Sequence, residues 1–200
     1  MAEDKSPNPG DIAAVLQNDL LFVRALVFLG ETHRSNPELW GRLLLDRHDP
    51  QIVRRLHVRL VLSLIESVVA SLKKDALGSS RLSAGERTLL TDTTYELSSD
   101  GDLIERTFFA PLLKTLRFAF RCYAKAHALD YSPDYSGPGW QALQSAVKIR
   151  NRITHPRKLD EMSISDTEMQ VVDSAHAWFM DCYRGLLGTR IADIERLLDR

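Results

Sequence analysis

The stretch AVKIRNRITHPRKLD, residues 146–160, starts with the periodicity of an amphipathic helix and ends in basic residues around His-Pro. At about 100° per residue, certain apolar residues fall on one narrow stripe of that helix: Ala142, Ala146, Ile149 and Ile153. We expect this stripe to pack on a core. Because Pro156 disfavours helical geometry at the residue before it, the sequence predicts a helix over residues 140–154 that ends at His155.

The other side of this helix carries polar residues: Lys148, Asn151, Arg152 and His155. Asn151 and His155 are four positions apart, so their side chains are neighbours on a helix. Arg150 lies about 140° around the helix from His155, and one straight helix therefore does not easily bring these two side chains to one point. The segment holds a run of cations with no acid among them: Lys148, Arg150, Arg152, Arg157 and Lys158.

Two interpretations of this segment stay open on the pattern alone. A basic last turn, a histidine near the helix end and a proline just beyond it are ordinary signals that stop a helix. The spacing of an arginine and a following histidine also recurs in the chain, at Arg42 to His48 and at Arg121 to His127. The segment is therefore either a helix stop or a chemical site.

Helix-start and helix-stop signals divide the rest of the chain into further helices. We expect helices over residues 11–32, 37–46, 50–77, 84 to the mid-90s, 103–128 and 166–187, with a short one from Ile191. Pro111 is expected to break or kink the helix that contains it. Residues 98–101 predict a turn and 130–139 a loop, and no stretch alternates strictly enough to predict a strand.

These elements predict an all-α fold, a helical bundle of long antiparallel helices. A length of 200 residues indicates one domain. We expect a flexible tail over residues 1–10 and a single domain over 11–200, with a polar insertion at about 78–106. The formal net charge of −1 excludes a polycation that binds nucleic acid with its whole surface.

Other classes of protein are disfavoured by missing patterns. Cys122 and Cys182 form no CxxC pair, which argues against a disulfide framework or a zinc knuckle and favours buried free thiols. The chain has no HExxH, Walker A, GxGxxG or GxSxG motif, so we predict no metal and no cofactor. It also shows no signal peptide and no run of about 18 apolar residues. We expect a cytoplasmic protein without a membrane span.

Residues 150–155 differ from the two other arginine-histidine spacings. An amide, Asn151, follows the arginine directly, and the histidine stands at a helix end before proline, on the second-last long helix. In these features RNRITHP resembles the HEPN superfamily (higher eukaryotes and prokaryotes nucleotide-binding domains). The signature of that superfamily is an arginine, a polar residue and a histidine that closes an Rx4–6H pattern. By context the resemblance covers about residues 140–187.

The resemblance implies a metal-independent endoribonuclease built as a two-fold homodimer. In such an enzyme the RNA 2′-hydroxyl attacks the adjacent phosphate and leaves a 2′,3′-cyclic phosphate and a 5′-hydroxyl. His155 would serve as acid or base, Arg150 would hold the phosphate, and Asn151 would orient the phosphate, the hydroxyl or His155. Since Arg150 and His155 diverge on one helix, we expect the same residues of two chains to line one groove.

Further residues are candidates with plainer alternatives. RNA phosphates could be bound by the basic residues Lys148, Arg152, Arg157 and Lys158, or these could form a solvated helix end. Glu66 interrupts the apolar run LVLSLIESVVASL and is either a supporting residue of the site or one member of an ion pair. Tyr131, Tyr135 and Trp140 either stack on unpaired bases or anchor their loop.

Several functions follow from these interpretations. The ribonuclease could act as a toxin or an antiphage defence effector, with an antitoxin or another regulatory partner protein. Alternatively, the chain is a non-catalytic HEPN-like dimerisation module that binds RNA, a nucleotide or a partner protein. A third alternative is a helical interaction protein in which residues 150–155 only end a helix.

Overall fold

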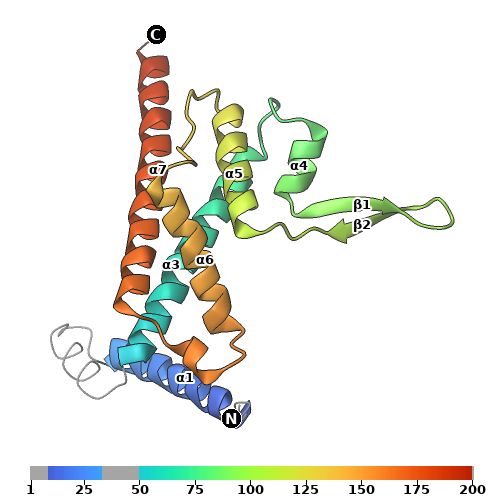
Figure 1. The fold of residues 1–200 in the computed structure, drawn as a ribbon. Helices are drawn as coiled ribbons and strands as arrows, with labels where there is room; N and C mark the ends of the chain where they lie inside the picture. The colour runs from blue at the N-terminus through green and yellow to red at the C-terminus, as the bar shows by residue number, and fades with distance from the viewer. Residues whose placement is uncertain (1–8, 33–49, 200) are drawn as a thin grey trace. The chain divides into compact units, whose positions relative to one another are not determined.

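The computed structural model describes residues 9–32 and 50–199 and is mostly helical (Figure 1). Within these residues the α-helices are α1 (Pro9–Thr32), α3 (Pro50–Ala76), α4 (Ala84–Leu90), α5 (Leu112–Ala126), α6 (Pro138–Thr154) and α7 (Asp166–Leu198). The remaining elements are the strands β1 (Thr93–Leu97) and β2 (Leu103–Thr107) and the short 3-10 helix η1 (Leu159–Met162). The predicted helical class is confirmed.

The helices predicted over 11–32, 50–77 and 140–154 are found within two residues of their expected bounds. The helix predicted over 103–128 begins only at Leu112, directly after Pro111, and the helix predicted over 166–187 extends further to Leu198. The helix predicted over 37–46 and residues 1–8 of the predicted tail lie outside the described residues, whereas residues 9 and 10 already belong to α1. The separate helix expected from Ile191 is wrong, because α7 runs without a break to Leu198. Gly188 costs such a helix only about 1 kcal/mol, and Asp193 pairs with two arginines three residues away, Arg190 and Arg196.

Residues 93–107 form an antiparallel hairpin, which corrects the two helices predicted across this stretch. The helix that starts at residue 84 ends at Leu90, and Asp92 has a left-handed φ of 56° that a helix cannot continue through. β1 then follows with the sequence TTYEL, which begins with two β-branched residues and an aromatic one. The predicted turn is confirmed: Gly101 has φ 85°, and the Ser98 N–H donates to the Asp102 carbonyl at 2.9 Å.

The chain divides into two compact units. Unit 1 comprises Met1–Leu62 and Ser145–Asp173, and unit 2 comprises Ser63–Gln144 and Ser174–Arg200. The divisions fall inside α3, α6 and α7, so each of these helices contributes residues to both units. The motif residues 150–155 all belong to unit 1.

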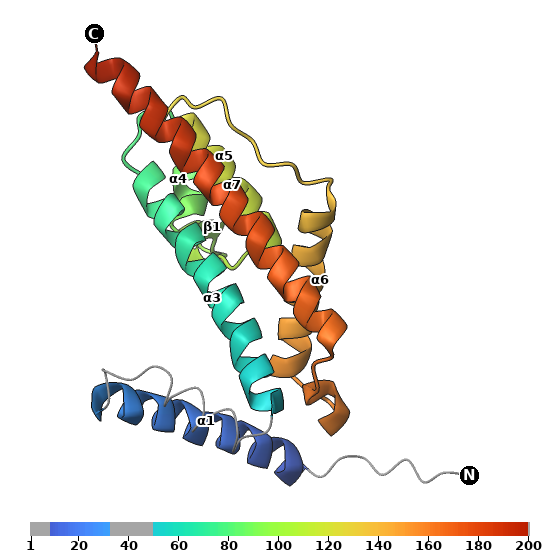
Figure 2. The ribbon, with the colours of Figure 1, turned by 90° about the vertical axis from the view of Figure 1, so that its left-hand side faces the viewer.

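In unit 1, α1 lies beside the first turns of α3 (Figure 2). The contact combines apolar packing with a buried ion pair. Phe22 of α1 and Ile52 of α3 form a small apolar cluster. The Asp19 carboxylate accepts hydrogen bonds from Arg55 Nε at 3.0 Å and Arg55 Nη2 at 2.7 Å, with both side chains almost completely buried. Such bidentate pairs fix orientation as well as supplying energy.

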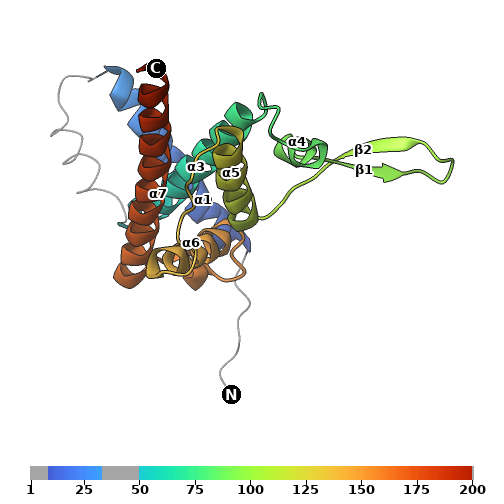
Figure 3. The same ribbon diagram turned by 90° about the horizontal axis from the view of Figure 1, so that it is seen from above.

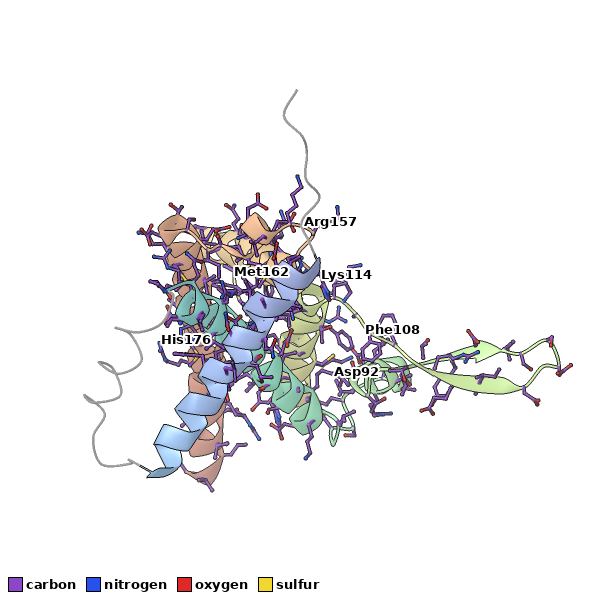
Figure 4. All side chains as sticks on the ribbon, turned by 90° about the horizontal axis from the view of Figure 1, so that it is seen from below. Asp92, Phe108, Lys114, Arg157, Met162 and His176 are labelled. Carbon is purple, nitrogen blue, oxygen red and sulfur yellow. The ribbon has the colours of Figure 1, made fainter. Side chains whose placement is uncertain are left out.

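In unit 2, α4 leads directly into the hairpin (Figure 3). The predicted capping box is confirmed, because the Glu86 N–H donates to Ser83 Oγ while the Ser83 N–H donates to Glu86 Oε2 at 2.8 Å. Where the hairpin joins the helices, Asp92 accepts the Phe108 N–H at 2.7 Å on its carbonyl and pairs with Lys73 through its carboxylate (Figure 4). A cluster of buried residues joins α3, α4 and α5: Ala76, Leu82, Leu90, Cys122 and Ala126.

The loop between α5 and α6 is held by its aromatic residues. The Tyr131 hydroxyl donates to the Cys182 carbonyl at 2.6 Å, and a Cβ added to Gly185 would lie 2.8 Å from that hydroxyl. The Tyr135 ring packs edge-on against Trp140, with 5.1 Å between ring centroids. Trp140 is only 4% exposed. These contacts favour the loop-anchor interpretation over base stacking for Trp140, whereas Tyr131 anchors the loop through its hydroxyl and keeps a half-buried ring.

Both thiols are buried, as predicted. Cys122 and Cys182 are free, and burial raises the pKa of both thiols, that of Cys182 to about 11. Among the residues that the structure describes, none of the helices combines the length and the apolar character needed to cross a membrane.

The C-terminal cap of α5 carries a strained alanine. Ala128 has φ 54°, and the Leu129 N–H donates to the Ala124 carbonyl at 2.8 Å, which is the Schellman arrangement that usually has glycine at this place. The left-handed conformation costs an L-residue about 1–2 kcal/mol. We expect Ala128→Gly to raise the free energy of unfolding by about 1 kcal/mol, after the greater freedom of glycine in the unfolded chain is subtracted. Urea unfolding checks this, and an unchanged or lowered value contradicts it.

Candidate functional site

The last turns of α6 carry the predicted apolar stripe on their buried side. Ala146, Ile149 and Ile153 are buried, whereas Ala142 is only half-buried and its neighbour Leu143 is fully buried instead. On the opposite side Lys148, Asn151 and His155 are exposed, while Arg150 and Arg152 are half-buried. The helix therefore presents the amide and the imidazole to solvent.

The helix ends where proline was expected to end it. The His155 N–H donates to the Asn151 carbonyl at 3.0 Å, and Pro156 has no N–H with which to continue the ladder. Thr154 Oγ1 donates to the Arg150 carbonyl at 2.7 Å, and Arg59 of α3 donates to the Ile153 carbonyl at 3.4 Å. The last four carbonyls of a helix lack partners inside it, and two of those in α6 are supplied: Asn151 by the His155 N–H and Ile153 by Arg59.

An open hollow of about 510 Å³ lies at this helix end, which we call the motif hollow. Its lining residues all belong to unit 1: Asn151, Arg152, His155, Arg157 and Glu161. Asn151 and His155 therefore share one surface, as their spacing predicted. Arg150 is not among the lining residues, in agreement with its position on another face of the helix. Of the two arginines in the lining, Arg157 is the exposed one.

Arg152 holds the segment after α6 in place. Its Nη1 donates to the Glu161 and Ser163 carbonyls, each at 2.9 Å, and its Nη2 donates to Glu168 Oε1 at 2.6 Å. Glu168 in turn forms a capping box with Ser165 at the start of α7. The guanidinium predicted to contact RNA is thus already committed to positioning the segment that contributes Glu161 to the motif hollow.

Replacing Arg152 by alanine should loosen this segment. We expect Arg152→Ala to lower the free energy of unfolding by about 1–2 kcal/mol, because two carbonyls and a carboxylate lose their charged donor, with a discount for the partly exposed ion pair. Arg152→Lys should recover only part of the loss, since an ammonium group cannot reproduce the planar fork. Urea unfolding of both variants measures the effect, and a full rescue by lysine would argue against the fork geometry.

Glu161 is the residue of the motif hollow that the sequence did not predict. It lies on η1, and its Oε2 accepts the Arg157 N–H at 2.7 Å. The basic run 148–158 contains no acid, but the structure folds η1 back so that a carboxylate joins it. With a neutral imidazole the five lining residues carry one net positive charge, and the Glu168 carboxylate that pairs with Arg152 balances it. The acidic pair Asp160-Glu161 just beyond the run was the available signal.

The other predicted residues lie outside the lining. Lys148 and Lys158 are exposed on unit 1, and neither is among the residues that line the motif hollow. Glu66 is half-buried and belongs to unit 2. Within residues 9–32 and 50–199, no group of three histidine, cysteine, aspartate or glutamate side chains is arranged to hold a metal ion.

The motif hollow combines groups that suit proton transfer beside an anion. Histidine is able to take or give a proton near neutral pH, and an amide both donates and accepts hydrogen bonds. The exposed guanidinium of Arg157 is a planar donor suited to phosphate or carboxylate. Comparisons of the chain with protein-family models, with curated proteins and with solved structures found no match.

Proposed function

We propose that the chain is a metal-independent endoribonuclease of the HEPN kind with Asn151 and His155 at its centre. The observation that carries the proposal is that these two side chains are exposed together in the motif hollow, beside Arg157. A plain helix stop requires neither an exposed imidazole nor an amide next to it. The exposed guanidinium of Arg157 favours an anionic group such as a phosphate.

The reaction uses the nucleophile that RNA itself supplies. The 2′-hydroxyl oxygen attacks the adjacent phosphorus and loses its proton, while the bond to the 5′-oxygen of the next nucleotide breaks and that oxygen gains a proton. The His155 imidazole of one site accepts the first proton and, as the imidazolium, donates a proton to the leaving 5′-oxygen. Asn151 orients the phosphate by hydrogen bonding, and a guanidinium stabilises its additional charge. The products are a 2′,3′-cyclic phosphate and a 5′-hydroxyl.

A two-fold homodimer would supply what one chain lacks. Arg150 does not line the motif hollow of its own chain. In the dimer, the Arg150 that acts beside His155 therefore comes from the α6 of the second chain. Mixing Arg150→Ala chains with His155→Ala chains tests this directly, because a mixed dimer regains one intact composite site. Activity should rise from near zero to about a quarter of wild type if half of the dimers are mixed. A mixture as inactive as its components contradicts the composite site.

The ribonuclease proposal itself is tested with purified wild-type chain and mixed RNA in the presence of EDTA. We expect cleavage to persist, and the new 3′ ends to be blocked until a phosphatase active on cyclic phosphates opens them. Loss of cleavage in EDTA would overturn the metal-independent route. Complete absence of cleavage, over a range of protein concentrations that includes dimers, would overturn the nuclease.

A second candidate function is a non-catalytic HEPN-like module that binds RNA, a nucleotide or a partner protein. The observation that favours it is Glu161, whose carboxylate lies in the motif hollow and opposes a phosphate there. RNA binding without cleavage, unchanged by His155→Ala, would support this module.

If the nuclease is confirmed, toxicity on expression and its loss in His155→Ala would extend the proposal to a toxin or defence effector with a regulatory partner.

A further inference from the structure

A second hollow, in unit 2, runs along α5 and the loop that follows it. Its volume is about 610 Å³. One wall carries the cations of α5: Lys114, Arg117, Arg121 and Lys125. The other wall carries Tyr131 and Tyr135 of the loop, and Phe118 contributes a third aromatic ring. No aspartate or glutamate is among its lining residues. We call it the α5 groove.

The four cations follow one face of the helix. Their spacing of i, i+3, i+7 and i+11 keeps them on one side, and at about 1.5 Å per residue the first and last are about 16 Å apart along the axis. A site for one phosphate group needs cations that converge on a point. Cations in a row instead match a ligand whose negative charges are also in a row.

Only part of this positive charge is neutralised by acidic groups of the protein itself. Lys114, at the start of α5 (Figure 4), and Arg121 are both exposed. Lys125 donates to both carboxylate oxygens of Glu86, at 2.9 and 2.7 Å, and this hydrogen bonding holds the pKa of Glu86 at about 2. Even with that carboxylate counted, the groove keeps a net positive charge.

The aromatic wall is already ordered. The Arg117 guanidinium lies 4.8 Å from the centroid of the Tyr135 ring and 4.5 Å from that of Trp140. These cation–π contacts hold both the Arg117 guanidinium and the Tyr135 ring in place. Tyr131 is tied down by its hydrogen bond to the Cys182 carbonyl. Rings that are ordered before binding lose little conformational freedom when a ligand stacks on them.

We propose that the α5 groove binds a single-stranded nucleic acid, with phosphates along the cations and bases against the exposed parts of the aromatic wall. Cationic grooves lined by aromatic rings are the usual design for single strands, since every base has a flat face. An acidic peptide would meet the charges but has no flat groups for the rings. A duplex keeps its bases stacked inside and would use only the charges. The proposal does not depend on cleavage at His155.

The test measures binding in the His155→Ala chain, so that a nuclease cannot consume the probe. Fluorescence anisotropy compares a labelled single-stranded RNA, the same sequence as DNA, an RNA duplex of equal length and a polyglutamate competitor. The test variant is Lys114→Glu with Arg121→Glu. The matched control is Lys74→Glu with Arg184→Glu, which changes the net charge equally at exposed residues of unit 2 outside the groove lining.

We expect the test variant to weaken single-strand binding by about tenfold or more and to reduce the salt slope by about 1.4, the value for two phosphate contacts on a single strand. The control should change binding less than about twofold. Lys114→Gln with Arg121→Gln should weaken it in the same direction by a smaller factor. Tighter binding of the RNA strand would show that the groove selects RNA, and equal binding of RNA and DNA would show that it accepts either. Each of these results supports the proposal.

Three results would overturn the proposal: equal losses in the test and control variants, duplex binding as tight as single-strand binding, or displacement of the strand by polyglutamate. Failure of the nuclease proposal leaves this measurement unaffected, because binding is read without cleavage. Loss of groove binding likewise leaves cleavage by His155 to be judged separately.

Discussion

His155→Ala is expected to lower the rate of RNA cleavage by about 100- to 10,000-fold, the range that general acid–base catalysis supplies. The imidazole is exposed in the motif hollow, and alanine removes the group that exchanges protons with the 2′-hydroxyl and the 5′-oxygen. Its side chain supports no core packing, so the variant should unfold at the same urea concentration as the wild type. Rates on a labelled RNA under single-turnover conditions measure the effect.

The matched control is His57→Ala. His57 also belongs to unit 1, and its Nε2 lies 2.8 Å from Asp173 Oδ1, outside the lining of the motif hollow. This variant should cleave RNA at the wild-type rate. Equal activity in His155→Ala and the wild type would show that the cleavage comes from another site or from a contaminant, and would remove the central residue of the proposed mechanism.

Asp19→Ala should have the largest effect on stability, lowering the free energy of unfolding by about 3–5 kcal/mol. Asp19 and Arg55 are 4% and 3% exposed, so the substitution leaves the Arg55 guanidinium buried without its carboxylate. Arg59, which also donates to Asp19, loses the same acceptor at 3.0 Å. Urea unfolding followed by circular dichroism gives the difference.

Two comparisons separate this cause from a general weakening of α1. Asp11→Ala removes an exposed acid in the first turn of the same helix and should cost less than about 1 kcal/mol. Asp19→Leu combined with Arg55→Met removes both members of the pair and should cost less than Asp19→Ala alone, since no charge stays buried. If the double variant is the less stable one, the uncompensated charge is not the reason for the loss.

The helix that carries the motif could be predicted because its signals are local. The apolar stripe of Ala146, Ile149 and Ile153 follows from helical spacing alone, and Pro156 determines where the ladder of hydrogen bonds stops. The same spacing places Asn151 and His155 on one surface and Arg150 on another. Nothing beyond the geometry of one helix is needed.

The hairpin could not be predicted in this way. Its strands have five residues each, too few for alternation to stand out, and the capping box at Ser83 favours a helix running through them. What ends that helix is the left-handed Asp92, which is held by Lys73 from another helix. For Glu161 the sequence shows only that an acid follows the basic run, because its place in the motif hollow depends on how η1 folds back.

The α5 groove is only half visible in the sequence. Its four cations recur at helical spacing along one helix. Arg121 also belongs to one of the arginine-histidine spacings, which makes this regularity less obvious. The aromatic wall has no local signal. It requires the loop after α5 to fold back over that helix and to be tied to α7 by Tyr131.

The burial of both native thiols makes the chain a convenient background for site-specific labelling. Burial raises the pKa of the Cys182 thiol to about 11, so little reactive thiolate forms at pH 7, and Cys122 is buried within the cluster joining α3, α4 and α5. A cysteine introduced on the surface would therefore react with maleimide dyes or spin labels far faster than either native residue. Such a label would report on its chosen surface position without first removing the native cysteines.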